Sequence, residues 1–197
     1  GFVLGHMIGN LQVFQGPEKL NHYAELLQGL GGALWAVRAV LLTCVVLHII
    51  SAYQLWRLKL SARPQAYVKK ATIATSYAAR TMIWSGPIIG AFLVYHLLHF
   101  TTGQALGDQF IKGDVYHNVI VGFRNPSASV FYIIANILLA IHLYHGVWSM
   151  FQSLGVNHPK YTPKLKTLAK IYGWVVGIGN VSMPLAVLTG LIGASAK

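Results

Sequence analysis

The stretch SASVFYIIANILLAIHLYHGVWSMFQSL, residues 127–154, contains no Asp, Glu, Lys or Arg. It exceeds the roughly 20 apolar residues that a helix needs to cross the hydrocarbon core of a bilayer. Three other long runs are similarly apolar, at 31–56, 81–103 and 171–194, and a shorter run opens the chain at 1–14. These runs predict transmembrane helices, because a backbone in lipid must satisfy its own hydrogen bonds.

The composition supports an integral membrane protein. Of the 197 residues, 55% are hydrophobic and only 10% are charged, whereas a soluble domain is about 25% charged. The net charge of +11 could indicate nucleic-acid binding, but the cations lie in short loops between the apolar runs, which is typical of membrane insertion. We therefore expect no nucleic acid partner. The sequence predicts an all-α, five-helix transmembrane bundle forming one domain over 1–197, with its first helix truncated at the N-terminus.

The loops predict the orientation of the bundle. A short amphipathic surface helix is expected at 17–29, and loops at 57–80, 104–126 and 155–170. Most Lys and Arg residues lie in 57–80 and 155–170, and the four acidic residues lie on the opposite side. Cytoplasmic loops carry the excess of Lys and Arg. The loops 57–80 and 155–170 are therefore predicted to face the cytoplasm.

Each of the first four apolar runs carries a histidine in its interior: His6, His48, His96 and His142. An ionisable side chain inside a membrane is costly and is a functional hypothesis by default. Neutral imidazole is a good axial ligand for haem iron, and imidazoles on two facing helices can hold one haem between them. The four histidines therefore predict two haems.

The orientation sorts these histidines into two depths. His6 and His96 lie in the later halves of helices that run outward, so both are expected near the outer face. His48 and His142 lie in the later halves of helices that run inward, so both are expected near the cytoplasm. We predict that His6 and His96 bind the iron of an outer haem, and that His48 and His142 bind the iron of an inner haem.

A flat haem also needs room beside the helix backbone, which small residues provide. Glycines lie close to three of the four predicted ligands, and we expect them to clear this space: Gly5, Gly9, Gly86, Gly90 and Gly146.

Two further histidines leave the choice of ligand open. His99 follows His96 by three residues and His145 follows His142 by three, so each pair shares roughly one helical face. By spacing alone either member could bind iron, and any single buried histidine could instead hydrogen bond between helices. We expect His99 and His145 to support the site by bonding a propionate or a quinone. Three other histidines lie in loops and are expected to be solvated: His22, His117 and His158.

Two arginines are candidates for binding haem propionates. Arg38 lies well inside the run 31–56 and needs an anionic partner there, which an outer-haem propionate would supply. Snorkelling to the interface or pairing with an acid in a loop are alternatives. Arg80 lies at the cytoplasmic start of the third run and could bind an inner propionate or anchor the helix at the interface.

The segments around the four histidines resemble the di-haem cytochrome b membrane anchor of succinate dehydrogenase and fumarate reductase, in its single-subunit, five-helix form. The resemblance covers essentially the whole chain. The segments that carry it are GHMIGNLQVFQGPEKLN, VVLHIISAYQLW, RTMIWSGPIIGAFLVYHLLHFT and FYIIANILLAIHLYHGVWSMF.

Two motifs of that family bear on the ambiguous pairs. The family's third-helix ligand follows an Arg-x-x-x-x-[ST]-Gly pattern, which matches RTMIWSG at 80–86 and then His96. The fourth-helix ligand precedes a Gly-x-Trp-Ser element, which matches GVWS at 146–149 and favours His142.

The resemblance implies an electron-transfer role in the bacterial cytoplasmic (inner) membrane. An iron–sulfur subunit would dock on the cytoplasmic face, a flavoprotein subunit would handle succinate and fumarate, and electrons would pass through two b haems to a quinone such as menaquinone. The complex could form a higher oligomer. The chain would be an enzyme only as a subunit of succinate:quinone oxidoreductase, without a flavin or dicarboxylate site of its own. In agreement, it contains no glycine-rich dinucleotide motif.

The quinone is expected near the outer haem, as in relatives, where a titratable group can exchange a proton with its ring. The candidates on that side of the membrane are His22, Glu25 and Asp114, and spacing does not select one of them. Both succinate oxidation and fumarate reduction are compatible with this arrangement.

Three other functions compete with this hypothesis. A cytochrome b anchor of a hydrogenase or a formate dehydrogenase would share the haem chemistry and differ in its soluble partners. A transporter or proton channel with a histidine relay would need acidic residues inside the membrane, and no predicted span contains one. A purely structural anchor would carry haem sites that no longer bind haem.

Overall fold

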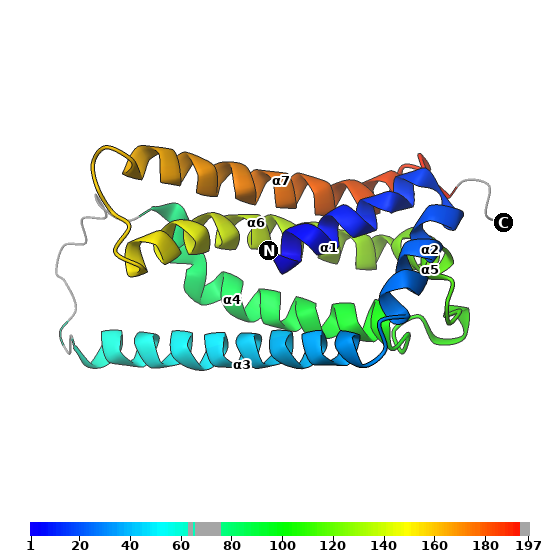
Figure 1. The fold of residues 1–197 in the computed structure, drawn as a ribbon, viewed down its shortest axis with the longest axis horizontal. Coiled ribbons are helices and arrows are strands. Elements are labelled where there is room, and N and C mark those ends of the chain that lie inside the picture. The colour runs from blue at the N-terminus through cyan, green and yellow to red at the C-terminus, as the bar shows by residue number, and fades with distance from the viewer. Residues whose placement is uncertain (63–64, 66–75, 194–197) are drawn as a thin grey trace. The chain divides into compact units, whose positions relative to one another are not determined.

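The computed structural model describes residues 1–62, 65 and 76–193, and this part of the chain forms helices and turns without a strand (Figure 1). The chain divides into two units, which are described separately. The first comprises Gly1–Ala24 with Thr75–Lys197, and the second is Glu25–Ala74.

The first unit holds most of the helices. Helices α6 and α7 run side by side along it (Figure 1). Its elements are α1 (Phe2–Asn10), the 3-10 helix η1 (Leu11–Gln15), the first part of α2 (Pro17–Gln28), α4 (Tyr77–His96), the π-helical turn η2 (Leu97–Thr101), the 3-10 turn η3 (Gly107–Gln109), α5 (Val115–Arg124), α6 (Pro126–Ser153) and α7 (Thr162–Leu188).

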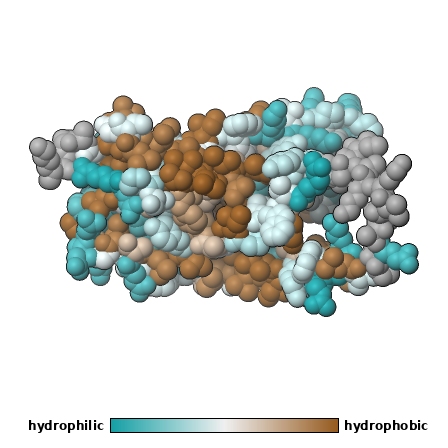
Figure 2. All heavy atoms as spheres, turned by 180° about the vertical axis from the view of Figure 1, so that it is seen from behind, coloured by the Kyte–Doolittle hydropathy of each residue, from teal (hydrophilic) through white to brown (hydrophobic). Residues whose placement is uncertain are grey.

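Four helical segments of the described chain are long and apolar enough to cross a membrane: Gly32–Ser61, Tyr77–Thr101, Pro126–Ser153 and Thr162–Leu188. This is the build of a multi-pass membrane protein, as predicted. Many large apolar side chains on these helices are exposed, and hydrophobic residues predominate over the middle of the face shown in Figure 2. The first predicted span, 1–14, forms the nine-residue α1 followed by η1.

The second unit consists mainly of α3 (Gly32–Ser61). Its 30 residues correspond to about 45 Å of helix, which is more than the bilayer core requires. The helix runs past the predicted end at residue 56, and Arg57 donates a hydrogen bond to the Tyr53 hydroxyl one turn earlier (3.2 Å). Among the other cations of the predicted loop 57–80, Arg63, Lys69 and Lys70 lie outside the described residues.

Helix α7 differs from the predicted run 171–194 at both ends. It begins at Thr162 with Pro163 in its first turn, where proline fits a helix well. The cationic residues before 171 therefore continue the helix beyond its apolar part. It ends at Leu188, and Gly190 then adopts a positive φ of 72°. Residue 194 lies outside the described residues.

Helix α5 lies where the sequence predicted only a loop, at 104–126. The Asp114 carboxylate caps its first turn by accepting a hydrogen bond from the His117 N–H (2.9 Å). The helix has ten residues and buries Ile120, Gly122 and Phe123 among others. It was missed because a segment this short, apolar on one side only, resembles a loop in sequence.

The core of the first unit joins α5 to its neighbours. It is built from side chains on η1, α2, α5, α6 and α7: Val13, Leu20, Ile120, Phe123, Tyr132, Met183 and Val187. Two side chains of this core, Phe123 and Tyr132, are aromatic neighbours of the histidines on α4 and η2. The core therefore anchors the region in which the candidate site lies.

Candidate functional site

The structure brings His6 of α1 and His96 of α4 together. Their ring centroids are 5.8 Å apart and their planes are nearly perpendicular, at 87°. Two imidazoles that were to hold one iron, with metal–nitrogen bonds of about 2 Å, would need their rings this close together. The separation fits this arrangement, while the role of both residues as haem ligands stays a prediction.

The His6 imidazole has a hydrogen-bond partner on its own helix. The Asn10 amide donates to its Nε2 (3.0 Å), and the ring stacks on Phe2 at 5.4 Å. An accepting Nε2 carries the lone pair that a metal would use, with the proton on Nδ1. Iron would therefore replace Asn10 at Nε2 without a change of tautomer.

The His96 imidazole is held from the opposite edge. Its Nδ1 lies 3.3 Å from the hydroxyl of Tyr132 on α6. Ligand histidines commonly use one nitrogen for the metal and the other for a hydrogen bond that fixes the ring. The contact with Tyr132 leaves Nε2 as the nitrogen for iron.

His99 is enclosed by protein on both edges. Its side chain is 2% exposed, its Nδ1 lies 3.1 Å from the Tyr132 hydroxyl, and its ring stacks on Phe100 at 4.1 Å. A Cβ at Gly122 would lie 2.7 Å from its Nε2, so this nitrogen sits directly against the backbone of α5. This packing favours His96 over His99 as an iron ligand.

Sequence reasoning missed Tyr132. This residue is 4% exposed and contacts both histidines. A tyrosine within a membrane-spanning run needs a partner for its hydroxyl, and that signal could have singled it out. The π-helical turn η2, which carries His99, had no visible signal in the sequence.

Four of the glycines near the histidines have open space at the position of a Cβ, and their role in making room for a haem stays a prediction. Apart from chain neighbours and the nearby backbone of the same helix, no atom lies within 4 Å of the position that a Cβ would take at Gly5, Gly86, Gly90 or Gly146. Gly9 was wrongly included in this set. The Tyr23 ring packs directly against it, so Gly9 permits the contact between α1 and α2.

The predicted inner pair falls in different units. His142 lies on α6, and its Nδ1 is 3.3 Å from the Ser85 hydroxyl of α4. This bond holds the ring by Nδ1, as Tyr132 holds His96. His48 lies on α3 in the second unit, and its pairing with His142 stays a prediction. His145, three residues further along α6, is half-buried.

Both candidate propionate arginines have neighbours in their own helices. The Arg38 guanidinium lies 4.9 Å from the centre of the Trp35 ring, a cation–π contact that sequence reasoning did not identify. Arg80 is exposed in the first turns of α4, and its backbone N–H donates to the Ser76 carbonyl oxygen (3.2 Å). Their roles toward propionates stay predictions.

The three quinone candidates are divided between the two units. His22 is exposed on α2, whereas Glu25 belongs to the second unit. Asp114 has a structural role. Besides capping α5, it accepts a hydrogen bond from the side-chain amide N–H of Asn21 (3.0 Å). The side-chain oxygen of Asn21 in turn accepts a hydrogen bond from the backbone N–H of Tyr116 (2.9 Å). Asn21 and Asp114 thus join α2 to α5.

Asp114 gives a pH-dependent prediction. Burial raises its pKa, but hydrogen bonds from the His117 N–H and the Asn21 side chain lower it by more, so the net pKa lies below the ordinary value of 3.8. A carboxyl with a lowered folded-state pKa stabilises the fold above its unfolded pKa and loses that effect as pH falls through the folded value. We expect Asp114→Ala to cost about 1 kcal/mol near neutral pH, measured as a lower melting temperature. The difference from wild type should shrink below pH 3.8. An equal difference at both pH values would contradict this role.

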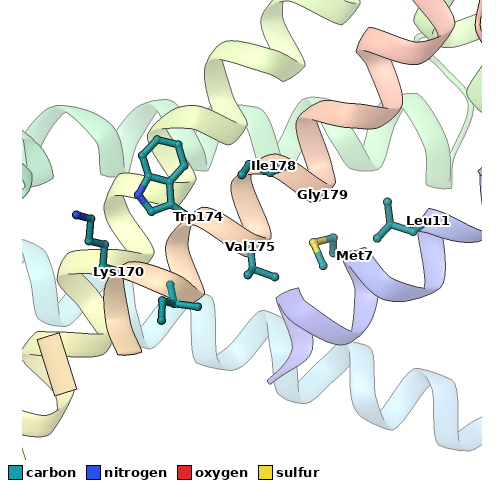
Figure 3. Close-up of a pocket in the computed structure, with 8 residues that line it drawn as sticks. Met7, Leu11, Lys170, Trp174, Val175, Ile178 and Gly179 are labelled. Atoms are coloured by element: carbon teal, nitrogen blue, oxygen red, sulfur yellow. The ribbon is translucent and has the colours of Figure 1, made fainter. Parts of the chain in front are cut away.

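A separate groove runs between α1 and α7 (Figure 3). Its volume is about 640 Å³ and its lining is almost entirely apolar, with Lys170 at one end and Leu11 at the other. The Met7 side chain reaches across to Gly179. None of the predicted site residues lines this groove, so it is not part of the histidine site.

Within the described residues, no group of three or more His, Cys, Asp and Glu converges so that it could hold a metal ion. Two imidazoles are the set that a six-coordinate haem iron takes from protein.

Comparisons with known proteins give no match: no protein-family model, no curated protein and no solved structure is similar to this chain.

Proposed function

We propose that this chain is the membrane anchor and electron-transfer subunit of a succinate:quinone oxidoreductase, with two b haems. The observation that carries the proposal is the pair His6 and His96, whose rings lie 5.8 Å apart on α1 and α4. Both residues lie in segments that resemble the di-haem cytochrome b anchors.

When bound, each haem would supply one-electron chemistry, because its iron changes between the ferric and ferrous states. The residues of this chain would provide its environment. His6 and His96 would hold the outer group, and His48 and His142 the inner one. Ser85 orients His142. The apolar helices would keep water away from the iron, which is one of the factors that set its reduction potential.

The remaining parts of the proposal follow the predicted orientation. The iron–sulfur subunit would dock on the cytoplasmic face, near the loops rich in Lys and Arg, and would exchange electrons through the inner haem. The outer haem would exchange electrons with membrane quinone. The flavoprotein subunit would complete the complex in the bacterial inner membrane.

The test is a haem count on the chain purified with its native partners. We expect two b haems per chain in a pyridine haemochrome assay, and a flavoprotein and an iron–sulfur subunit by mass spectrometry. His48→Ala should lose the inner haem and keep most of the outer one. A colourless preparation would refute the proposal, and hydrogenase or formate dehydrogenase subunits would reassign the partner while keeping the haem chemistry.

A further inference from the structure

Three side chains of the first unit meet at one hydroxyl group. The Tyr132 oxygen lies 3.3 Å from Nδ1 of His96 and 3.1 Å from Nδ1 of His99. They come from α6, α4 and η2. The contact therefore depends on how α4 packs against α6 and on the π-helical turn that follows His96.

The chemistry of the hydroxyl limits the directions of the two hydrogen bonds. A phenol has one proton, so it cannot donate to both histidines and must accept from at least one of them. A histidine that binds iron through Nε2 carries its proton on Nδ1. His96 Nδ1–H would therefore donate to the Tyr132 oxygen. The Tyr132 O–H would then donate to Nδ1 of His99, the second nitrogen within hydrogen-bond distance of this buried hydroxyl.

The surroundings hold these groups in place. The Tyr132 ring packs edge-on against Phe92 (5.0 Å) and Phe123 (4.9 Å). His99 lies between the Phe100 ring and the backbone of Gly122. Tyr132 and His99 are 4% and 2% exposed. In such dry surroundings water does not replace a lost partner, so these hydrogen bonds are strongly orienting.

We propose that Tyr132 and His99 are positioning residues for the outer-haem ligand His96. This inference rests on the proposed function. Tyr132 fixes the tautomer and rotation of the His96 ring by accepting a hydrogen bond from its Nδ1–H, and His99 fixes the hydroxyl. Hydrogen bonding at the second nitrogen makes an imidazole a stronger donor to its metal. This stabilises ferric iron and lowers the midpoint potential of the outer haem.

The test compares Tyr132→Phe with the matched control Tyr95→Phe, both in the complete complex. Tyr95 packs against His99 and Tyr132 at 5.2 and 5.9 Å, but the histidine hydrogen bonds use the Tyr132 hydroxyl. We expect Tyr132→Phe to weaken outer-haem binding about tenfold. It should also raise that haem's midpoint potential by up to about 59 mV, which corresponds to a tenfold change in the equilibrium between ferric and ferrous iron. The EPR g values of the outer haem should shift, and the inner haem should not change.

Substitutions at His99 separate hydrogen bonding from packing. His99→Asn keeps a side-chain oxygen close to the position of Nδ1 and should stay near the wild-type potential, whereas His99→Leu should raise it as Tyr132→Phe does. If the wild type holds two haems, two results would overturn this inference and leave the proposed function standing. One is an equal midpoint potential of the outer haem in Tyr132→Phe and Tyr95→Phe. The other is an equal potential in His99→Asn and His99→Leu. A wild type without haem would overturn the proposed function as well.

Discussion

Replacement of His96 with alanine is expected to halve the haem content, from two haems per chain to one. The outer iron would lose the ligand on α4. His99 cannot take its place, because its Nδ1 is hydrogen bonded to Tyr132 and its Nε2 packs against the backbone of Gly122. The pyridine haemochrome assay, referred to protein concentration, measures this loss directly. The remaining haem should have the spectrum and midpoint potential of the inner haem.

A histidine away from the pair provides the control for this experiment. His158 is exposed in the loop before α7, where it stacks on Tyr161 at 5.4 Å. His158→Ala should keep both haems. If His96→Ala also kept both, and His99→Ala lost one, the ligand on this segment would be His99.

Replacement of Gly173 with alanine is expected to destabilise the protein by about 1–3 kcal/mol. Gly173 and Gly177 lie where α7 crosses α6, and small residues let membrane helices approach closely. A Cβ at Gly173 would lie 2.6 Å from the Ala140 carbonyl oxygen, and one at Gly177 would lie 2.8 Å from the Ala140 Cβ. Because a backbone carbonyl cannot move aside as a flexible side chain can, α6 and α7 must separate.

Thermal unfolding in detergent measures this effect. A change from glycine to alanine inside a helix normally stabilises it by roughly 0.5–1 kcal/mol. Gly173→Ala should instead lower the stability of the protein. Gly32→Ala is the control, because a Cβ at that position would meet no atom within 4 Å apart from its chain neighbours and the nearby backbone of its own helix. A melting temperature of Gly173→Ala equal to or above that of Gly32→Ala would show that close packing of α6 on α7 is not required. Haem should also be lost from Gly173→Ala, since α6 carries Tyr132 and His142.

The elements that the sequence predicted well are those with strong local signals. Long apolar runs predicted α3, α4, α6 and α7, because the cost of exposing backbone polar groups to lipid depends only on the segment itself. The ends of these helices were less accurate. Helix α7 starts at Thr162, before its apolar part. The polar residues there join the helix because a proline fits well in its first turn. Helix α5 was missed because its stability comes from the Asp114 cap and from burial against other helices.

The sequence by itself determined that this chain crosses a membrane and carries histidines within its apolar runs, because length, hydropathy and residue identity are local properties. It also paired His6 with His96, and His48 with His142, by the depths predicted for them. Only the tertiary structure decided that their rings lie 5.8 Å apart, that Tyr132 links His96 to His99, and that Asp114 joins two helices. Most of these contacts connect residues far apart in the chain, and their existence depends on how α1, α2, α4, α5 and α6 pack, which no single segment encodes.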